Sequence, residues 1–160
     1  HLKPVGRLDK DSTGLIILTN DGEFINEMTH PSIKVPKVYL VQINGKFTAD
    51  DAEKMLNGIV IETDSGEKKT AYAETLPIEV NSKSSEIQVV LYQGINRQIR
   101  KMFAKLGFEV KSLKRIQHAT LTLEGLKRGQ IKAIKPKQVK ELKGYIAKIK
   151  REYAQNSNNG

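Results

Sequence analysis

The sequence has 160 residues, of which 27 are Lys or Arg and 18 are Asp or Glu, so the formal net charge is +9. A chain of this length can bury about 70% of the surface that its unfolded form exposes, which is enough for one compact domain with a core of its own. It contains no cysteine and only three scattered His residues, so disulfides, thiolate nucleophiles and cysteine-ligated zinc are excluded, no metal site is predicted, and a reducing cytoplasm is the expected location.

Four elements are predicted in the first 58 residues from the spacing of apolar residues and from helix start and stop signals. They are, in chain order, a buried strand at residues 15–18, a helix that starts at Asn20 and stops before Pro31, a strand at 38–43, and a helix from Thr48 to Gly58 with Ala52, Met55 and Leu56 facing inward. In both helices an acidic residue follows the first one at the spacing of a capping box.

Strands and helices alternate irregularly in the rest of the chain. Further strands are predicted at 59–62, 70–75, 87–92, 110–123 and 130–134, and further helices at 96–106 and from Pro136 to about Ala154. We expect residues 1–154 to form a single domain and residues 155–160 to be a disordered polar tail. This arrangement favours an α+β fold, with a mixed, mostly antiparallel sheet and flanking helices, over a doubly wound sheet.

The positive charge is concentrated in the second part of the chain. Residues 1–93 carry 10 basic and 14 acidic side chains, whereas residues 94–160 carry 17 basic and 4 acidic ones. Such a concentration is typical of a protein that binds a phosphate backbone, because each Lys or Arg near a phosphate releases condensed counterions. A solvated, Lys-rich surface is the alternative, which we favour for the final helix only. No segment joins a basic face to the bulky apolar face of an interfacial helix, so no membrane partner is expected.

The turn at residues 9–13, just before the first predicted strand, has the most candidate functional side chains in the first half of the chain. We call it the acidic turn. Asp9, Asp11 and Thr13 alternate there, as in the nucleophile loop of haloacid-dehalogenase-type phosphatases and the calcium loop of EF-hands. The phosphatase loop needs an apolar strand before its first Asp, and the calcium loop needs a bidentate Glu where Asn20 stands, so both interpretations are disfavoured. A hydrogen-bonded turn in which Asp11 and Ser12 cap backbone amides explains Asp11. It does not explain Asp9.

The helix predicted at 96–106 has a basic face. At about 100° per residue, Arg97, Lys101 and Lys105 lie opposite its apolar stripe, where they can face phosphates. Arg100 lies at about a right angle to the stripe by the same spacing, where its guanidinium can reach into a cleft and pair with a carboxylate. For most helices with such a basic face, the face is simply solvated. Here the combination of the basic face with the acidic turn favours a functional role for the face.

Three ordered motifs resemble those of a known enzyme family. They are Gly6-Arg7-Leu8-Asp9 with Ser12-Thr13-Gly14-Leu15 and Leu18-Thr19-Asn20-Asp21-Gly22, then Lys37-Val38-Tyr39, then Gly94-Ile95-Asn96-Arg97-Gln98-Ile99-Arg100-Lys101-Met102. From about Val5 to Ile134 the chain resembles the bacterial ribosomal-RNA pseudouridine synthases of the RsuA/RluB/RluF type. The resemblance implies a pseudouridine-synthase-like fold with a central RNA-binding cleft, and isomerisation of uridine to pseudouridine without a metal or an organic cofactor.

The resemblance also implies roles for individual residues. Asp9 matches the family's catalytic aspartate, Tyr39 its active-site tyrosine, and Arg100 the basic residue that pairs with the aspartate. Ribosomal RNA is the expected partner of a monomeric protein, which would contact it through Arg7, Lys37, Asn96, Arg97, Lys101, Lys105, Lys114 and Arg115.

Two further expectations concern the missing part of the protein and its target. Family members usually carry an S4-type RNA-binding domain and an opening catalytic strand, and we expect this chain to lack both. The motif from Tyr92 to Arg100 looks closest to the large-subunit members, so 23S rRNA is the favoured target. A 16S rRNA pseudouridine synthase and a non-catalytic rRNA-binding or ribosome-assembly factor are the alternatives.

Overall fold

The computed structural model describes residues 1–159, with side chains described through residue 156. Its strands are β1 (Lys3–Pro4), β2 (Thr13–Gly14), β3 (Leu18–Thr19), β4 (Lys37–Asn44), β5 (Ile59–Glu62), β6 (Lys68–Ala71), β7 (Glu74–Val80), β8 (Ser84–Leu91), β9 (Val110–His118) and β10 (Leu121–Thr122). Its helices are α1 (Gly22–Thr29), α2 (Ala49–Asn57), α3 (Gln98–Lys105) and α4 (Pro136–Asn159).

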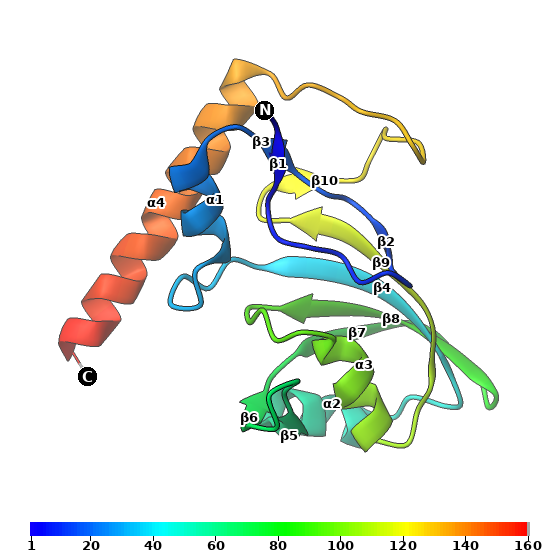
Figure 1. Ribbon diagram of the computed structural model, residues 1–160. Helices are drawn as coiled ribbons and strands as arrows, with labels where there is room; N and C mark the ends of the chain where they lie inside the picture. The colour runs from blue at the N-terminus through cyan, green and yellow to red at the C-terminus, as the bar shows by residue number, and fades with distance from the viewer. Residues whose placement is uncertain (160) are drawn as a thin grey trace.

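A mixed six-stranded sheet runs through the centre of the molecule (Figure 1). Five of its strands follow the order β10-β9-β4-β8-β7 with antiparallel neighbours, and β2 joins β9 as a parallel partner. β1 with β3 and β5 with β6 form two separate antiparallel pairs. The predicted α+β class with a mostly antiparallel sheet is confirmed.

Buried apolar side chains form two clusters rather than the single core expected from chain length. One cluster packs α2 and α3 on the central strands and includes Met55 and Phe103. The other packs α1 against α4 and includes Met28 and Ile146. Figure 1 shows α1 and α4 side by side, away from α2 and α3.

The parallel pairing of β2 with β9 depends on Gly14. Its φ is 116°, and a Cβ atom there would lie 2.2 Å from the backbone oxygen of Arg115. Only glycine tolerates both the dihedral angle and this close approach. The next residue, Leu15, donates its N–H to the same oxygen at 2.8 Å. The acidic turn is therefore fixed to the central sheet.

Several predicted elements are confirmed. β4 and β5 cover the strands predicted at 38–43 and 59–62. The capping box of α2 is formed, because Thr48 Oγ1 accepts the Asp51 N–H at 3.2 Å and the Asp51 carboxylate accepts the Thr48 N–H at 2.9 Å. Gly58 ends this helix as predicted.

The strand predicted at residues 15–18 is wrong. Between β2 and β3 the chain changes partner: Leu15 bonds to β9, and the Ile17 carbonyl accepts the N–H of Val5 beside β1 at 2.8 Å. A change of partner within three residues leaves no continuous ladder, although Leu15 and Ile17 are buried.

Two details of the first helices also differ from prediction. The carboxylate of Asp21, rather than the side chain of Asn20, accepts the Phe24 N–H at 3.1 Å, so α1 starts one residue later. In α2, Met55 is fully buried but Leu56 is 58% exposed, because the next residue on a helix points about 100° away.

The predicted strand at 70–75 is divided, because β6 pairs with β5 whereas β7 pairs with β8. The strand predicted at 110–123 is likewise divided into β9 and β10 by a turn in which Ala119 has a φ of 54°. The strand predicted at 130–134 is wrong, since the chain there forms no strand and Ile131 is 83% exposed. Apolar spacing without a partner strand does not make a strand.

The final helix is longer than predicted. α4 continues to Asn159, so its expected end near Ala154 is wrong and residues 155–159 of the predicted disordered tail are helical. No Pro or Gly interrupts residues 145–159, so nothing in the sequence forces the helix to stop. Gly160 lies outside the described residues. Within the described part of the chain, no helix has the length and apolar character needed to cross a bilayer.

Candidate active site

A pocket opens between the two apolar clusters. Its walls come from the acidic turn after β1, from β4, from the loop between β8 and α3, and from β9. Asp9, Tyr39 and Arg115 line it from three of these segments. The fold therefore gathers polar side chains that are distant in the sequence.

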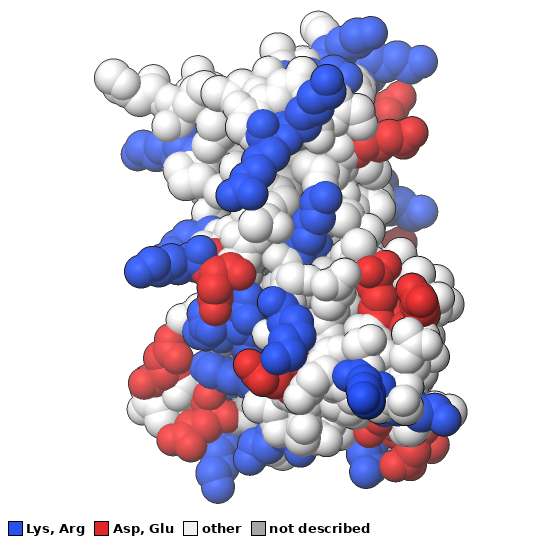
Figure 2. Space-filling view, turned by 90° about the vertical axis from the view of Figure 1, so that its right-hand side faces the viewer, with Lys and Arg blue, Asp and Glu red and all other residues white. Residues whose placement is uncertain are grey.

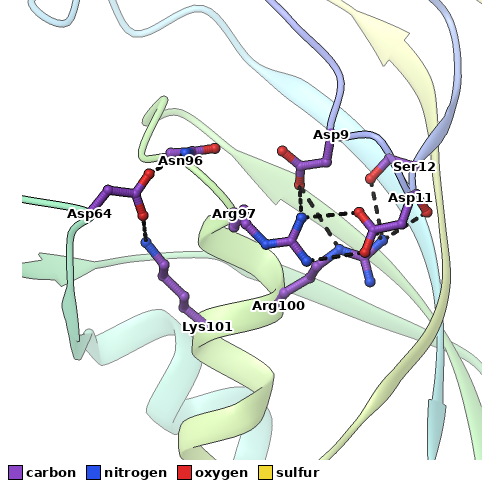
Figure 3. Close-up of polar contacts among 8 residues, drawn as sticks. All are labelled: Asp9, Asp11, Ser12, Asp64, Asn96, Arg97, Arg100 and Lys101. Atoms are coloured by element: carbon purple, nitrogen blue, oxygen red, sulfur yellow. Dashed lines mark hydrogen bonds and ion pairs between the residues drawn. The ribbon is translucent and has the colours of Figure 1, made fainter.

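Asp9 lies in this pocket close to two guanidinium groups (Figure 3). Arg97 Nη1 and Arg100 Nε each lie 3.9 Å from Asp9 Oδ2. The Asp9 side chain is 22% exposed and that of Arg100 only 15% exposed, so water screens these charges less than at an open surface. The contact predicted between Asp9 and Arg100 is present as a long ion pair.

Asp11 holds the same two arginines more closely. Arg97 donates from Nη1 and Nη2 to the two carboxylate oxygens of Asp11 at 3.0 and 3.1 Å. Arg100 Nη2 donates to the backbone oxygen of Asp11 at 3.0 Å. The hydrogen bonds from Arg97 hold the pKa of the Asp11 carboxyl at about 2, below its ordinary value of 3.8. The predicted turn is hydrogen-bonded, since the Ser12 N–H donates to the Asp9 backbone oxygen at 3.0 Å. The main partner of the Asp11 carboxylate is Arg97, which the prediction did not include.

The backbone of Arg97 adopts an unusual conformation. Its φ of 55° and ψ of 31° lie in the left-handed region, which residues other than glycine rarely enter. α3 accordingly begins at Gln98 rather than at Asn96 as predicted. Gln98 is 2% exposed and donates from Nε2 to the Tyr72 backbone oxygen at 3.2 Å and to Gln93 Oε1 at 3.1 Å. This buried amide and the ion pair with the acidic turn hold the strained residue at the pocket wall.

The hairpin between β5 and β6 holds two further predicted RNA contacts. Asp64 accepts a hydrogen bond from Asn96 Nδ2 and one from Lys101 Nζ, the latter at 3.1 Å (Figure 3). The hydrogen bond from Lys101 is the main reason why the pKa of Asp64 is lowered. In the free protein the charge of Lys101 is therefore paired with a carboxylate.

Three residues, Lys37, Arg115 and His118, form a basic wall of the pocket, which we call the inner wall. In the ladder between β4 and β9, Tyr39 pairs with Arg115 and Lys37 pairs with His118. Arg115 and His118 are each 2% exposed. Burial, together with the charge of Arg115, lowers the pKa of Lys37 to about 8 and that of His118 to about 3. His118 is therefore neutral at pH 7. Burial also raises the pKa of the Tyr39 phenol.

Most of the predicted site residues meet at this pocket. Its lining includes Asp9, Tyr39 and the predicted RNA contacts Arg7, Lys37, Asn96, Arg97 and Arg115. Arg115 is almost completely buried and forms the floor of the pocket. Lys105 at the end of α3 and Lys114 on β9 are exposed and lie apart from the lining residues.

Sequence reasoning missed His118. Strict alternation along β9 would place Leu113, Arg115 and Gln117 on one face. The register shifts between Val38 and Tyr39, where the ladder skips one residue of β9, so His118 turns inward instead. A bulge of this kind leaves no signal in the apolar pattern. The pairing of Asp64 with α3 was missed for a similar reason, because it joins two distant segments.

The surface around the site is unevenly charged. Figure 2 shows Lys and Arg side chains over the whole height of one face, whereas most of the Asp and Glu side chains on that face lie in its lower half. The upper half, where acidic side chains are few, suits contact with a nucleic-acid backbone. Among the described residues, no three His, Asp or Glu side chains are grouped so that they could hold a metal ion.

The arrangement is suited to chemistry on a planar, uncharged ring. A carboxylate held near two guanidinium groups can act as a nucleophile or a base. Tyr39 offers an aromatic surface, and the inner wall offers hydrogen-bond donors to carbonyl oxygens.

Comparison with known proteins is consistent with this chemistry. Residues 1–105 match the RNA pseudouridylate synthase family. The chain is 39% identical over 143 residues to the ribosomal large subunit pseudouridine synthase B of Bacillus subtilis (strain 168), covering 89% of this chain and 58% of that protein. It is 34% identical over 139 residues to the ribosomal large subunit pseudouridine synthase E of Vibrio parahaemolyticus, covering 81% of this chain and 58% of that protein. The chain thus spans a little more than half the length of these relatives.

Solved structures support the same assignment. A crystal structure described as a pseudouridylate synthase matches with a TM-score of 0.77 and 27% identity, covering 88% of this chain and 59% of that chain. The human RNA pseudouridylate synthase domain containing 1 shares the fold, with a TM-score of 0.56 and 11% identity over 89% of this chain and 80% of that chain. The matched segment 1–105 contains Asp9, Tyr39 and Arg100, and the chain belongs to the RNA pseudouridylate synthase family.

Proposed function

We propose that this protein isomerises a uridine of ribosomal RNA to pseudouridine, with Asp9 as the catalytic carboxylate. The observation that carries the proposal is the place of Asp9, which lies in a basic pocket with two guanidinium groups at 3.9 Å. A carboxylate there repels phosphates, so a protein that only binds RNA gains nothing from it. The alternative of a non-catalytic assembly factor is disfavoured for that reason.

The reaction rearranges one nucleotide without an external reactant. The bond between uracil N1 and ribose C1′ breaks, the base turns, and a new bond joins C5 to C1′. N1 gains a proton and C5 loses one, so the product is an isomer of the substrate. The target uridine must first leave its stack to reach the pocket. Tyr39 then offers the base an aromatic surface, and Asp9 acts on the nucleotide as a nucleophile or a base.

The remaining basic residues position the RNA and the carboxylate. Arg100 is a positioning residue, because it holds Asp9 and the backbone of Asp11 at the same time. Arg7 and Arg97 stand in the pocket wall, where phosphates on either side of the flipped nucleotide can reach them. A phosphate can replace Asp11 as the partner of Arg97, because both present paired oxygens to the guanidinium.

We favour large-subunit rRNA as the target and the cytoplasm as the location. Two relatives that cover most of this chain are named as large-subunit pseudouridine synthases. A site in 16S rRNA is the other outcome that the experiment below can give.

The test is to map pseudouridines in rRNA from cells that lack the gene. Carbodiimide treatment and primer extension should show one stop that disappears in 23S rRNA of these cells and returns when the intact gene is restored. Unchanged stops in both rRNAs would contradict the proposed function, and a lost stop in 16S rRNA would correct the target.

A further inference from the structure

The inner wall of the pocket contains several polar atoms that lack a partner within the protein. Arg115 Nη2 and both ring nitrogens of His118 are buried and make no hydrogen bond with any described residue. Arg115 Nε donates to the backbone oxygen of Leu15 at 2.8 Å, which fixes the guanidinium so that Nη2 remains free. Lys37 pairs with His118 across the ladder, and its Nζ atom lies 3.9 Å from the position that a Cβ of Gly94 would take at the pocket wall.

These groups are expensive to bury without a partner. An unsatisfied buried donor or acceptor costs about 1–3 kcal/mol, and a charged one costs more. The acidic group among the residues that line the pocket is Asp9, which is engaged by Arg97 and Arg100. The inner wall thus holds two cations and a neutral imidazole that are arranged for a ligand rather than for the stability of the free protein.

The hydrogen-bonding groups of the inner wall match the edge of uracil. That edge has an N–H donor between two carbonyl acceptors. A neutral imidazole supplies one acceptor and one donor, while the ammonium and the guanidinium supply donors only. Tyr39 pairs with Arg115 across the ladder and lines the same pocket, so a base lying against the Tyr39 ring has its edge beside the inner wall. A phosphate would use the cations but would leave the imidazole acceptor unpaired.

We propose that Lys37, Arg115 and His118 bind the carbonyl edge of the flipped uracil and stabilise the negative charge that the base acquires when its bond to ribose breaks. When the C1′–N1 bond breaks, its electron pair stays with the ring and spreads to the two carbonyl oxygens. The charge is neutralised when C5 bonds to C1′ and loses its proton while N1 takes one up. This inference rests on the proposed synthase activity and adds a catalytic role for the wall opposite Asp9.

A fluorinated substrate separates this role from a phosphate contact. Fluorine at C5 withdraws electrons and makes uracil a better leaving group, so it reduces the need for stabilisation by the protein. Ribosomal RNA is transcribed with either UTP or 5-fluoro-UTP, and cleavage of the nucleoside at the target is followed under single-turnover conditions by nuclease digestion and chromatography. Loss of one such stabilising donor costs about 100-fold in rate, which is the effect expected for Lys37→Met on uridine RNA. On fluorouridine RNA the same substitution should cost about tenfold or less.

The control is Lys46→Met, which removes the same charge from an exposed position beyond the opposite end of β4. It should leave both rates unchanged. Equal rate losses of Lys37→Met on the two RNAs, with a salt dependence of binding reduced by about one counterion, would overturn the inference and make Lys37 a phosphate contact. If the unaltered protein does not rearrange uridine RNA, the proposed function itself fails; on fluorouridine RNA only cleavage of the C1′–N1 bond is compared, because C5 there has no proton to lose.

A second pair of variants tests His118. His118→Gln keeps a donor and an acceptor, whereas His118→Leu removes both. We expect His118→Leu to lose about 100-fold in rate and His118→Gln about tenfold, with RNA affinity unchanged in both. Thermal unfolding of each variant shows whether it is folded. Equal rates for the two folded variants would remove His118 from the proposed site.

Discussion

Replacement of His118 by Leu should change how the stability of the fold depends on pH. His118 is 2% exposed and its two ring nitrogens have no partner among the described residues. Burial, together with the charges of Arg115 and Lys37, lowers its pKa from 6.5 to about 3. The folded protein therefore keeps this imidazole neutral between pH 5 and pH 7.

The sign of the effect follows from proton binding. Between pH 3 and pH 6.5 the unfolded chain binds a proton at His118 that the folded chain does not. Protons then favour unfolding. The titration of His118 therefore leaves the free energy of unfolding unchanged above pH 6.5 and lowers it as the pH falls from 6.5 toward 3. One pKa unit corresponds to about 1.4 kcal/mol, so the loss is about 2 kcal/mol between pH 7 and pH 5 and reaches about 5 kcal/mol below pH 3.

The assay is urea unfolding of the unaltered protein and of His118→Leu at several values between pH 7 and pH 5. At pH 7 the variant should be at least as stable as the unaltered protein, because it loses two buried polar atoms without partners. Its advantage should grow by about 2 kcal/mol by pH 5. Carboxylates that titrate in the same range affect both proteins equally and cancel in the difference. Parallel stability curves over this range would refute the reasoning, because they would show that His118 titrates alike in the folded and unfolded chains.

Three further predictions concern other parts of the site. Since the pKa of Lys37 is lowered to about 8, activity should fall above that pH as the ammonium loses its proton, and Lys37→Arg should move the fall in the pH–rate profile to higher pH. Gly14→Ala should cost about 3 kcal/mol in urea unfolding, because its Cβ would lie 2.2 Å from a backbone oxygen of β9; Gly22→Ala, with no atom within 4 Å of the new Cβ, should not cost stability. Arg100→Ala should lose far more activity than Lys105→Ala in a single-turnover assay, whereas equal losses would reduce Arg100 to a phosphate contact.

The local parts of this structure could be predicted from the sequence. Thr48 and Asp51 lie within one turn of helix, so their capping box follows from spacing alone. The apolar repeat of α3 predicted its buried face correctly, since Ile99, Met102 and Phe103 are all buried. Resemblance of motifs placed Asp9 and Tyr39 in a common site, and the structure brings both into one pocket.

The parts that depend on contacts between distant segments could not be predicted. Arg97 was expected to face phosphates, but in the free protein Asp11, on a turn fixed to β9, pairs with it. Arg115 was expected among the RNA contacts, yet it is almost completely buried at the floor of the pocket, where β9 pairs with β2. His118 faces the pocket only because β9 contains a bulge. Each of these depends on strand pairing rather than on local periodicity.

The central claim is that Asp9 carries out the chemistry. Asp9→Asn keeps the size of the side chain and removes its negative charge, so the fold and the RNA contacts should remain. The most direct measurement is therefore the formation of pseudouridine by purified full-length protein and by its Asp9→Asn variant on rRNA from cells that lack the gene, with RNA affinity measured in parallel. We predict that the variant binds RNA as well as the unaltered protein does but forms no pseudouridine. An Asp9→Asn protein that still forms pseudouridine at the normal rate would contradict the assignment of Asp9 as the catalytic residue.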